Sequence, residues 1–494
     1  MSKSKLILPI AAAMLLASCG GGATGLSSKA TLTSHEQKGG IIKEETSITF
    51  WSTFNDNYQS TIQEAAKKFM ELEPKVTVEI KKESGSYDAL KDKVIENLAA
   101  QSHPDMFVGY PDSVQELMQY GAVVKLDDYM NNAEYGWAAD EKADVIKAYI
   151  DEGQSYPIEG TYSVPVAKST EAMFYNKDVL IGLNLSAQDP TINEGKPLTE
   201  AYINNLTWEE LFDKLCPAIV AYNDGLAEEK KILRTSGEKK TAVFAYDSDD
   251  NLFITLAEQY GYGYTSIDTS TGTGSIDFVN DGMKGLLKKF YGYAHKEGTP
   301  YFLTKGSNEN KYTNENFTAG YTLFSVGSTG GASYQKSDNF DTGVAKIPHA
   351  AGKAAKVINQ GPSIAVLDHK DENRRLASWL FYKFFTNVDN AAVWAVNSGY
   401  NPIRYSTLDS ETYAEYASIE GKQPRTVDMI KARVSQYVTT VADDLFANFV
   451  FKGSAEARKQ AGALFTNALM QDNLTDESLN KLFDDAKNNV LAKM

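Results

Sequence analysis

Alternating and periodic hydrophobic positions organise the first part of the folded chain. Residues 48–51 alternate β-branched and aromatic side chains, as strands do, and residues 58–71 carry apolar side chains at helical spacing. The order then repeats with a strand over 76–80, a helix over 87–100 and a strand over 105–108. This βαβαβ order predicts a parallel sheet with right-handed crossovers, covered by helices on both faces.

The pattern continues through a second set of elements. Residues 162–166 and 172–176 read as extended, and Thr207 with Glu210 forms a capping-box pattern that predicts a helix start. Residues 223–242 are charged and lack periodicity, which indicates a loop. Further helices are predicted over 283–294, 374–385, 391–396 and, as a tail, 455–492. The chain therefore reads as α/β with two or more domains.

The N-terminus has the pattern of an export signal. Two lysines precede an apolar run over 6–17 that is shorter than the ~20 residues of a membrane-spanning helix, and Cys19 follows small residues. Leu16-Ala17-Ser18-Cys19 resembles a bacterial lipobox, which implies a signal peptide over 1–18 and acylation of Cys19. The alternative is an ordinary secretory signal. Glycines and serines after Cys19 predict a flexible tether over 19–45, so that the protein is held on the extracytoplasmic face of the cell membrane by its lipid.

Cysteine count and charge exclude several classes. Cys216 is the only other cysteine, so an acylated Cys19 leaves no intrachain disulfide, and Cys216 is expected to be a small buried side chain. The net charge of −16 disfavours binding to nucleic acid. With 42% hydrophobic residues the chain is expected to fold, and its 28 tyrosines suit concave surfaces that bind polyhydroxylated ligands.

Several motifs, in order, resemble family 1 extracellular solute-binding proteins, which serve ABC importers of sugars and glycerol phosphates. They span nearly the whole mature chain, and the most specific is Met173-Phe174-Tyr175-Asn176-Lys177-Asp178-Val179-Leu180. The others are the opening strand ending Phe50-Trp51-Ser52, the Glu71-Leu72-Glu73-Pro74 helix end, Pro104-Asp105-Met106-Phe107, Gly121-Ala122-Val123, Ser163-Val164-Pro165, Thr207-Trp208-Glu209-Glu210-Leu211 and Ser398-Gly399-Tyr400-Asn401-Pro402.

The resemblance implies a two-lobe periplasmic-binding-protein-like fold of type II, in which each lobe is a mainly parallel sheet flanked by helices. A solute would bind in the cleft between the lobes. The expected boundaries are 46–166 and 330–365 for the N-terminal lobe, and 167–329 and 366–494 for the C-terminal lobe. A monomer is expected because the lobes must move freely.

Within that family the chain is similar to glycerol-3-phosphate and glycerophosphodiester binders. The matching positions imply ligand contacts by Tyr87, Ser169, Ser328 with its neighbour Thr329, Gly361 and Tyr400. That subgroup also supplies an arginine for phosphate, for which Arg433 is the candidate here, with Lys431 close by. Because this stretch aligns insecurely, the ligand class expected first is a mono- or oligosaccharide, and a glycerol phosphate is the alternative.

Further candidates follow from position in the predicted sheet. Trp51 ends the first strand, and Tyr110 and Asp112 follow the third, at the edge where open α/β sheets bind ligands. Trp51 is equally explained as a core aromatic, and the other two as solvated loop residues. Glu171 lies in the first crossover and is either a ligand acceptor or a charge at a strand end.

An exported glycoside hydrolase is the alternative from another class, and a surface adhesin is a third. The five histidines lack metal-ligand spacing, no nucleophile elbow is present, and the carboxylate pairs are only adjacent in sequence. The expectation is therefore a binding protein that is not an enzyme, has no cofactor or metal, and has as partners a small polar solute and the transmembrane subunits of an ABC permease.

Overall fold

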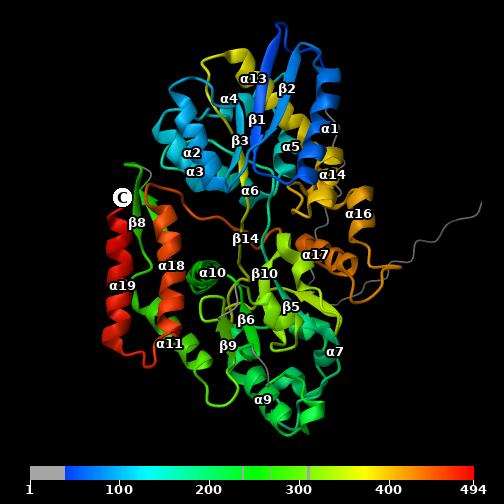
Figure 1. The fold of residues 1–494 in the computed structure, drawn as a ribbon, viewed down its shortest axis with the longest axis vertical. Coiled ribbons are helices and arrows are strands. Elements are labelled where there is room, and N and C mark those ends of the chain that lie inside the picture. The colour runs from blue at the N-terminus through cyan, green and yellow to red at the C-terminus, as the bar shows by residue number, and fades with distance from the viewer. Residues whose placement is uncertain (1–38, 236–238, 269, 309–311) are drawn as a thin grey trace, which may run out of the picture.

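The computed structural model describes residues 39–494 except 236–238, 269 and 309–311. Figure 1 shows two α/β lobes stacked along the long axis, each built on its own sheet. We call the lobe that contains β1 the first lobe and the lobe that contains β5 the second lobe. The expected signal peptide, the acylated Cys19 and most of the tether lie outside the described residues. No helix in the described part of the chain is long and apolar enough to cross a membrane.

The first lobe is built on a mixed five-stranded sheet. Its strands, in spatial order, are β2 (Val76–Lys82), β1 (Thr46–Ser52), β3 (Met106–Gly109), β13 (Ser363–Val366) and β4 (Val164–Pro165). β2, β1 and β3 are parallel, as the βαβαβ pattern predicts, whereas β13 is antiparallel to both β3 and β4. The sheet is therefore mixed rather than mainly parallel.

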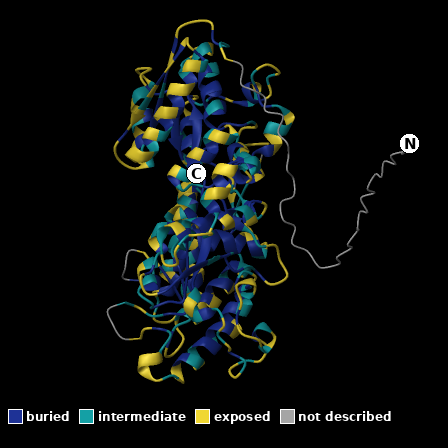
Figure 2. Ribbon diagram, turned by 90° about the vertical axis from the view of Figure 1, so that its right-hand side faces the viewer, coloured by how far each residue is buried: buried dark blue, intermediate teal, exposed yellow. Residues whose placement is uncertain are grey.

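Alternation along β1 divides its side chains between two packed layers. Ile48 and Phe50 belong to the core that contains helices α1 (Asp56–Leu72) and α13 (Glu372–Phe385), while Trp51 packs with α2 (Tyr87–Leu98) and α3 (Pro111–Gln119) on the other face. Successive strand residues point to opposite faces, so one strand supplies both cores. Figure 2 shows this buried interior beneath exposed outer helix faces.

The second lobe has a mixed sheet of the same size. Its strands, in spatial order, are β11 (Thr342–Ala345), β5 (Glu171–Asn176), β10 (Phe324–Ser328), β6 (Phe244–Tyr246) and β9 (Phe302–Thr304). β5 is antiparallel to both of its neighbours, and β10, β6 and β9 are parallel. The remaining pairs are β7 (Thr265–Asp268) with β8 (Thr273–Ile276), and β12 (Val357–Ile358) with β14 (Leu445–Phe446).

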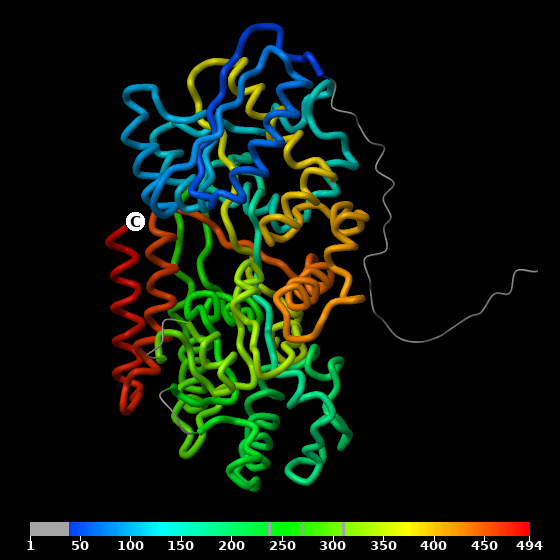
Figure 3. Tube along the Cα trace, turned by 45° about the vertical axis from the view of Figure 1, so that its right-hand side comes forward, coloured from blue at the N-terminus to red at the C-terminus, as the bar shows by residue number. Residues whose placement is uncertain are grey.

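Helices complete both lobes. The longer ones beyond those already given are α6 (Lys147–Gln154), α9 (Cys216–Asp224), α10 (Asp249–Tyr260), α11 (Asp281–Ala294), α14 (Val388–Ser398), α16 (Glu411–Ala417), α17 (Val427–Val441), α18 (Ser454–Leu469) and α19 (Asp476–Leu491). Short helices are α4 (Asp127–Met130), α5 (Ala139–Asp144), α7 (Lys177–Leu180), α8 (Glu200–Ile203), α12 (Asn314–Thr318), α15 (Tyr405–Leu408), η1 (Ile192–Gly195), η2 (Glu210–Leu215), η3 (Glu228–Lys230) and η4 (Thr329–Gln335). The predicted helical tail is two helices, α18 and α19, which pack together along the second lobe (Figure 3).

The late segments divide between the lobes differently from the expected boundaries. β11 lies within 330–365 yet pairs with β5 in the second sheet. α13 and α14 lie within 366–494, yet Trp379 and Trp394 belong to the core of the first lobe. The physical reason is that β13 brings the chain back into the first sheet, and two amphipathic helices follow it before the chain leaves again.

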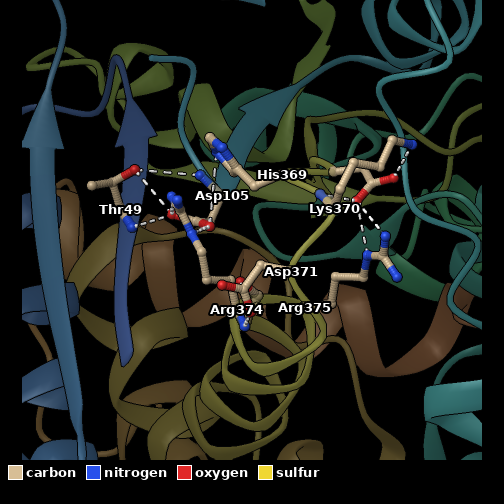
Figure 4. Close-up of polar contacts among 9 residues, drawn as sticks. Thr49, Asp105, His369, Lys370, Asp371, Arg374 and Arg375 are labelled. Atoms are coloured by element: carbon tan, nitrogen blue, oxygen red, sulfur yellow. Dashed lines mark hydrogen bonds and ion pairs between the residues drawn. The ribbon is translucent and has the colours of Figure 1, made fainter. Parts of the chain in front are cut away.

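An ion pair between a buried carboxylate and a partly exposed arginine holds α13 against the first sheet. Asp105, 1% exposed at the start of β3, accepts hydrogen bonds from the Nε and Nη2 of Arg374 on α13 at 2.6 and 2.8 Å, and from the Thr49 backbone N–H at 2.8 Å (Figure 4). His369 lies beside this pair, with its ring stacked on His103. One carboxylate thus joins β1, β3 and α13.

In the part of the predicted tether that the structure describes, the chain packs against the first lobe and is not solvated. Ile42 is 2% exposed in the core of the first lobe, and the backbone N–H groups of Ile41 and Ile42 donate to the Glu73 carboxylate. The tether therefore ends before residue 41, because an apolar pair and a buried carboxylate hold the chain there.

Candidate ligand-binding cleft

Two adjoining cavities lie where the lobes meet. The interlobe cavity, of about 410 Å³, is lined by the start of α3 in the first lobe, the start of α18 in the second and residues 359–361 between them. The sheet-edge cavity, of about 510 Å³, lies over Glu171 and the start of α10. The two share Ser248, Asp250 and Gln360, so we treat them as one cleft.

The residues of the first lobe that line the cleft lie where strands end and helices begin. β3 ends at Gly109, and Pro111 begins α3 at a position where a missing N–H costs nothing. Tyr110 between them is 42% exposed, and its ring meets that of Tyr87 edge-on at 5.1 Å. Tyr87 itself begins α2, after Ser86 caps that helix. Two aromatic rings thus stand at the carboxyl edge of the first sheet.

Asp112 links the lobes directly. Its Oδ1 accepts a hydrogen bond from Ser454 Oγ, the first residue of α18. Burial raises the pKa of Asp112, although the Ser454 hydrogen bond and the nearby Arg458 charge act in the opposite direction. The contact therefore crosses the cleft between a helix of the first lobe and a helix of the second.

Tyr400 stands in an aromatic cluster behind the cleft. Gly399 ends α14 in the left-handed conformation, and the Tyr400 ring then lies 6.2 Å from Trp394 and 5.9 Å from Tyr58. Burial raises the pKa of Tyr400 to about 12, and the neighbouring Tyr87 hydroxyl acts in the opposite direction.

Three residues for which the family resemblance implies ligand contacts lie close together around Gly330. A Cβ added at Gly330 would lie 3.6 Å from Ser328 Oγ and 3.9 Å from both Ser169 Cβ and Tyr400 Cε1. Two segments run side by side between the lobes, residues 167–170 and 359–361, and we call them the crossing segments. Thr329 is 2% exposed, accepts from the Thr170 backbone N–H and donates to Asn401 Oδ1, so it supports these segments from inside. Ser169, Ser328 and Tyr400 are thus neighbours in space.

Glu171 lies at the floor of the sheet-edge cavity, 1% exposed. Its carboxylate accepts hydrogen bonds from the Tyr246 hydroxyl and from Asn251 Nδ2, the latter at 2.9 Å. No cation pairs with it among the ion pairs of the described residues, so burial raises its pKa to about 8. Asn251 Oδ1 in turn accepts from Gln360 at 2.6 Å and from Arg458.

The raised pKa of Glu171 predicts a pH-dependent stability. Between the unfolded value of 4.5 and the folded value of about 8, only the folded state keeps the proton. This contribution is complete below the unfolded value and is lost as pH rises through the folded one, at about 1.4 kcal/mol per pH unit. Urea unfolding at about pH 6.5 and 7.5 should show that slope in the native chain and lose it in Glu171→Gln. An unchanged slope in that variant, or its loss in the surface control Glu96→Gln, would refute the assignment.

Comparison with known proteins identifies the chain's family. Residues 64–421, well over half of the chain, match the family model described as bacterial extracellular solute-binding protein. The chain belongs to this family. Its members are non-catalytic receptors, which confirms the expectation of a binding protein rather than a hydrolase.

Solved structures of solute-binding proteins share the fold. The cyclic α-maltosyl-1,6-maltose binding protein of Arthrobacter globiformis superposes with a TM-score of 0.64 at 17% identity, covering 90% of this chain and 98% of that one. UgpB of Mycobacterium tuberculosis, in complex with glycerophosphocholine, gives 0.63 at 19% identity and covers 90% and 97%. MalE of Listeria monocytogenes, in complex with maltose, gives 0.62 at 16% identity and covers 91% and 99%. The two-lobe fold is therefore that of periplasmic binding proteins.

Two of the predicted site residues of this solute-binding protein lie away from the cleft. Trp51 is 6% exposed inside the first lobe, with Lys81 Nζ 4.5 Å from its ring, because the alternation of β1 turns it toward α2. Arg433 on α17 pairs with Asp341 at 2.7 Å and lines a separate depression beside Tyr175. Neither side chain lines the cavities, and the guanidinium of Arg433 already has a carboxylate partner.

Other polar residues in the cleft of the solute-binding protein have no counterpart in the sequence analysis. They are Ser248, Asp250 and Asn251 at the start of α10, Asn359 and Gln360 on a crossing segment, and Arg458 on α18. Adjacent carboxylates such as Asp249 and Asp250 are expected from the sequence alone to be solvated charge. Asp250 instead binds Arg458 at 2.7 Å. In the described part of the chain no group of three or more acidic, histidine or cysteine side chains is placed to hold a metal ion, and Cys216 is buried.

Proposed function

We propose that this solute-binding protein captures a mono- or oligosaccharide in the cleft between its lobes and delivers it to the permease of an ABC importer. Acylation of Cys19 would hold it at the extracytoplasmic face of the membrane. The observation that carries the proposal is a cleft lined from both lobes by hydroxyl, amide and carboxylate groups together with aromatic rings. Sugars present hydroxyls at their edges and apolar C–H faces, which this combination matches.

Five of the sequence-predicted residues line the cleft and are the proposed ligand contacts: Tyr110, Asp112, Glu171, Ser328 and Gly361. Tyr87, Ser169 and Tyr400 stand next to them and hold the wall in place. Thr329 supports the crossing segments. A glycerol phosphate is the second candidate, because Arg433 lies outside the cleft and Arg458 is engaged by Asp250. The other cations that line the cleft are Lys305 and Lys459 of the sheet-edge cavity.

Ligand-dependent thermal stabilisation tests the proposal. Maltotriose, cellobiose, chitin and chitosan disaccharides, and glycerophosphocholine would be screened by differential scanning fluorimetry without any enzyme added. A sugar at about 100 times its Kd should stabilise the folded state by about 2.7 kcal/mol, a shift of several degrees in Tm. The sugar should be recovered chemically unchanged. Stabilisation by glycerophosphocholine alone would contradict the carbohydrate assignment.

A matched pair of variants tests whether the ligand binds in the cleft. Tyr110→Ala should abolish the ligand-induced shift, because it removes an exposed ring of the cleft. Tyr120→Ala, on the same lobe and 58% exposed outside both cavities, should leave the shift unchanged. Equal effects of the two variants would place the ligand elsewhere.

A further inference from the structure

A short segment between β14 and α18 reaches from the second lobe into the first. It comprises residues 447–453, and we call it the strap. Val450, 5% exposed, belongs to an apolar core whose other members come from the first lobe, among them Val114. Its backbone N–H donates to the carbonyl oxygen of Ser155 at 2.8 Å, directly before the first-lobe core residue Tyr156. One buried side chain and one hydrogen bond therefore anchor the strap in the first lobe.

The next residue of the strap is buried in the second lobe. Phe451 is 1% exposed, and its ring packs so closely on β8 that a Cβ added at Gly274 would lie 2.1 Å from it. The hairpin of β7 and β8 leads directly to Phe278 in the core of the second lobe. Two consecutive residues, Val450 and Phe451, are thus buried in different lobes.

Further contacts join the lobes beside the strap. Ser454 Oγ accepts from the Phe451 backbone N–H at 3.3 Å and donates to Asp112 of the first lobe. At the tip of the hairpin, a Cβ added at Gly272 would lie 3.2 Å from Pro157. The strap residues that line the interlobe cavity are Asn448, Phe449 and Val450. A solute in this cavity would therefore meet the strap.

The two buried side chains restrict how the lobes can separate. Consecutive Cα atoms are about 3.8 Å apart, so the lobes can move apart at this edge by only a few ångströms while both side chains stay buried. Wider opening requires one of the two to leave its core. Val450 has the smaller apolar surface, and the stabilisation from burial grows with that surface. Val450 therefore leaves its core more readily than Phe451.

We propose that the strap is a latch: Val450 is docked in the first-lobe core when the cleft is closed around a solute, and it leaves that core when the cleft opens. The proposal rests on the carbohydrate function above and adds a residue that sets affinity without being one of the proposed ligand contacts. A solute that fills the interlobe cavity stabilises the docked strap, because the strap forms one wall of that cavity. Undocking lowers the fraction of protein that is competent to bind, and the apparent affinity falls with it.

Amide hydrogen exchange of the wild-type chain measures the undocking directly. The Val450 N–H is held by its hydrogen bond to Ser155, so it exchanges when the strap leaves the first lobe. Peptides over 447–453 should exchange faster than peptides within α18. Addition of the screened sugar that gives the largest shift in Tm, whether maltotriose, cellobiose or the chitin disaccharide, should slow the exchange of the strap. A sugar that binds without slowing this exchange would overturn the latch.

Val450→Ala should weaken the latch. The loss of two methyl groups from the core lowers the docking equilibrium constant by about tenfold. The strap should therefore exchange about tenfold faster, and the affinity for the same sugar should fall by about three- to tenfold. Val76→Ala is the matched control, because it removes the same two groups from the other core of the first lobe, where Val76 is 3% exposed on β2. It should destabilise the fold and leave strap exchange and affinity unchanged.

Small-angle X-ray scattering of the ligand-free variants tests whether the strap controls the lobes. Val450→Ala should have a larger radius of gyration than the wild type, and Val76→Ala should not. Faster strap exchange at an unchanged radius would confine the motion to the strap and overturn its coupling to the lobes. Equal strap exchange in the two variants would overturn the latch and leave the carbohydrate function intact. If none of the sugars binds the wild type, the proposed function fails, and the ligand-free comparison still decides whether the latch exists.

Discussion

Alanine at Gly361 is expected to destabilise the fold by about 2–4 kcal/mol and to lower ligand affinity with it. Gly361 has φ +94°, and a Cβ added there would lie 2.1 Å from the backbone oxygen of Ala167. That oxygen belongs to the other crossing segment, which is also held by the hydrogen bonds between Ser169 and Gln360. The two crossing chains must therefore separate to admit one methyl group. Urea unfolding and titration with the best ligand of the screen measure both effects.

Gly352→Ala is the matched control. Gly352 also has a positive φ, of 70°, but nothing lies within 4 Å of an added Cβ. The control should cost only the backbone strain of about 1–2 kcal/mol and leave affinity unchanged. If Gly361→Ala lowers the free energy of unfolding by no more than Gly352→Ala does, the close approach of the two crossing segments does not restrict residue 361.

Methionine at Lys168 is expected to cost about 3–5 kcal/mol, because it leaves a buried carboxylate without its cation. Lys168 is 0% exposed, and burial lowers its pKa in spite of the Glu152 charge beside it. The Glu152 carboxylate also accepts from Asn359 and from Ser363 at 3.1 Å, so α6, β13 and both crossing segments meet at one ion pair. A two-state unfolding curve would measure the loss.

Two further variants isolate the buried charge. Lys147→Met breaks an ion pair with Asp151 whose lysine side chain is 81% exposed, and it should change stability by less than about 1 kcal/mol. Glu152→Gln added to Lys168→Met removes the uncompensated charge and should recover part of the loss. The explanation would be contradicted if the double variant had a lower free energy of unfolding than Lys168→Met alone, by as much as Glu152→Gln costs when it is the only change.

The early strands could be predicted because their signals are local. Alternation over 48–51 and helical spacing over 58–71 depend only on neighbouring residues, and β1, β2 and β3 are parallel as that order predicts. The late return of the chain has no such signal. β13 joins the first sheet antiparallel to β3, and the pairing of Asp105 with Arg374 joins residues 269 positions apart. The lobe boundaries after residue 330 depend on these distant pairings, which leave no local sequence pattern. The boundaries in the structure therefore differ from the predicted ones.

The cleft was predictable only where strand ends define it. Tyr110 and Asp112 follow β3 at the carboxyl edge of the sheet, and the structure has them there. The alternation that makes Phe50 a core residue also sends Trp51 to the opposite, helix-covered face. Arg458 meets Asn251 from a helix 207 positions away, so no local pattern marks that contact. Only the folded chain brings these two residues together.

A crystal structure with the sugar that most stabilises the protein in the thermal screen tests most directly whether one solute is held between the two lobes. We expect electron density for the sugar that touches Asp112 and Tyr110 from the first lobe and Glu171 or Ser328 from the second. A disaccharide bound on the outer face of one lobe, with the cleft filled only by water, would contradict it.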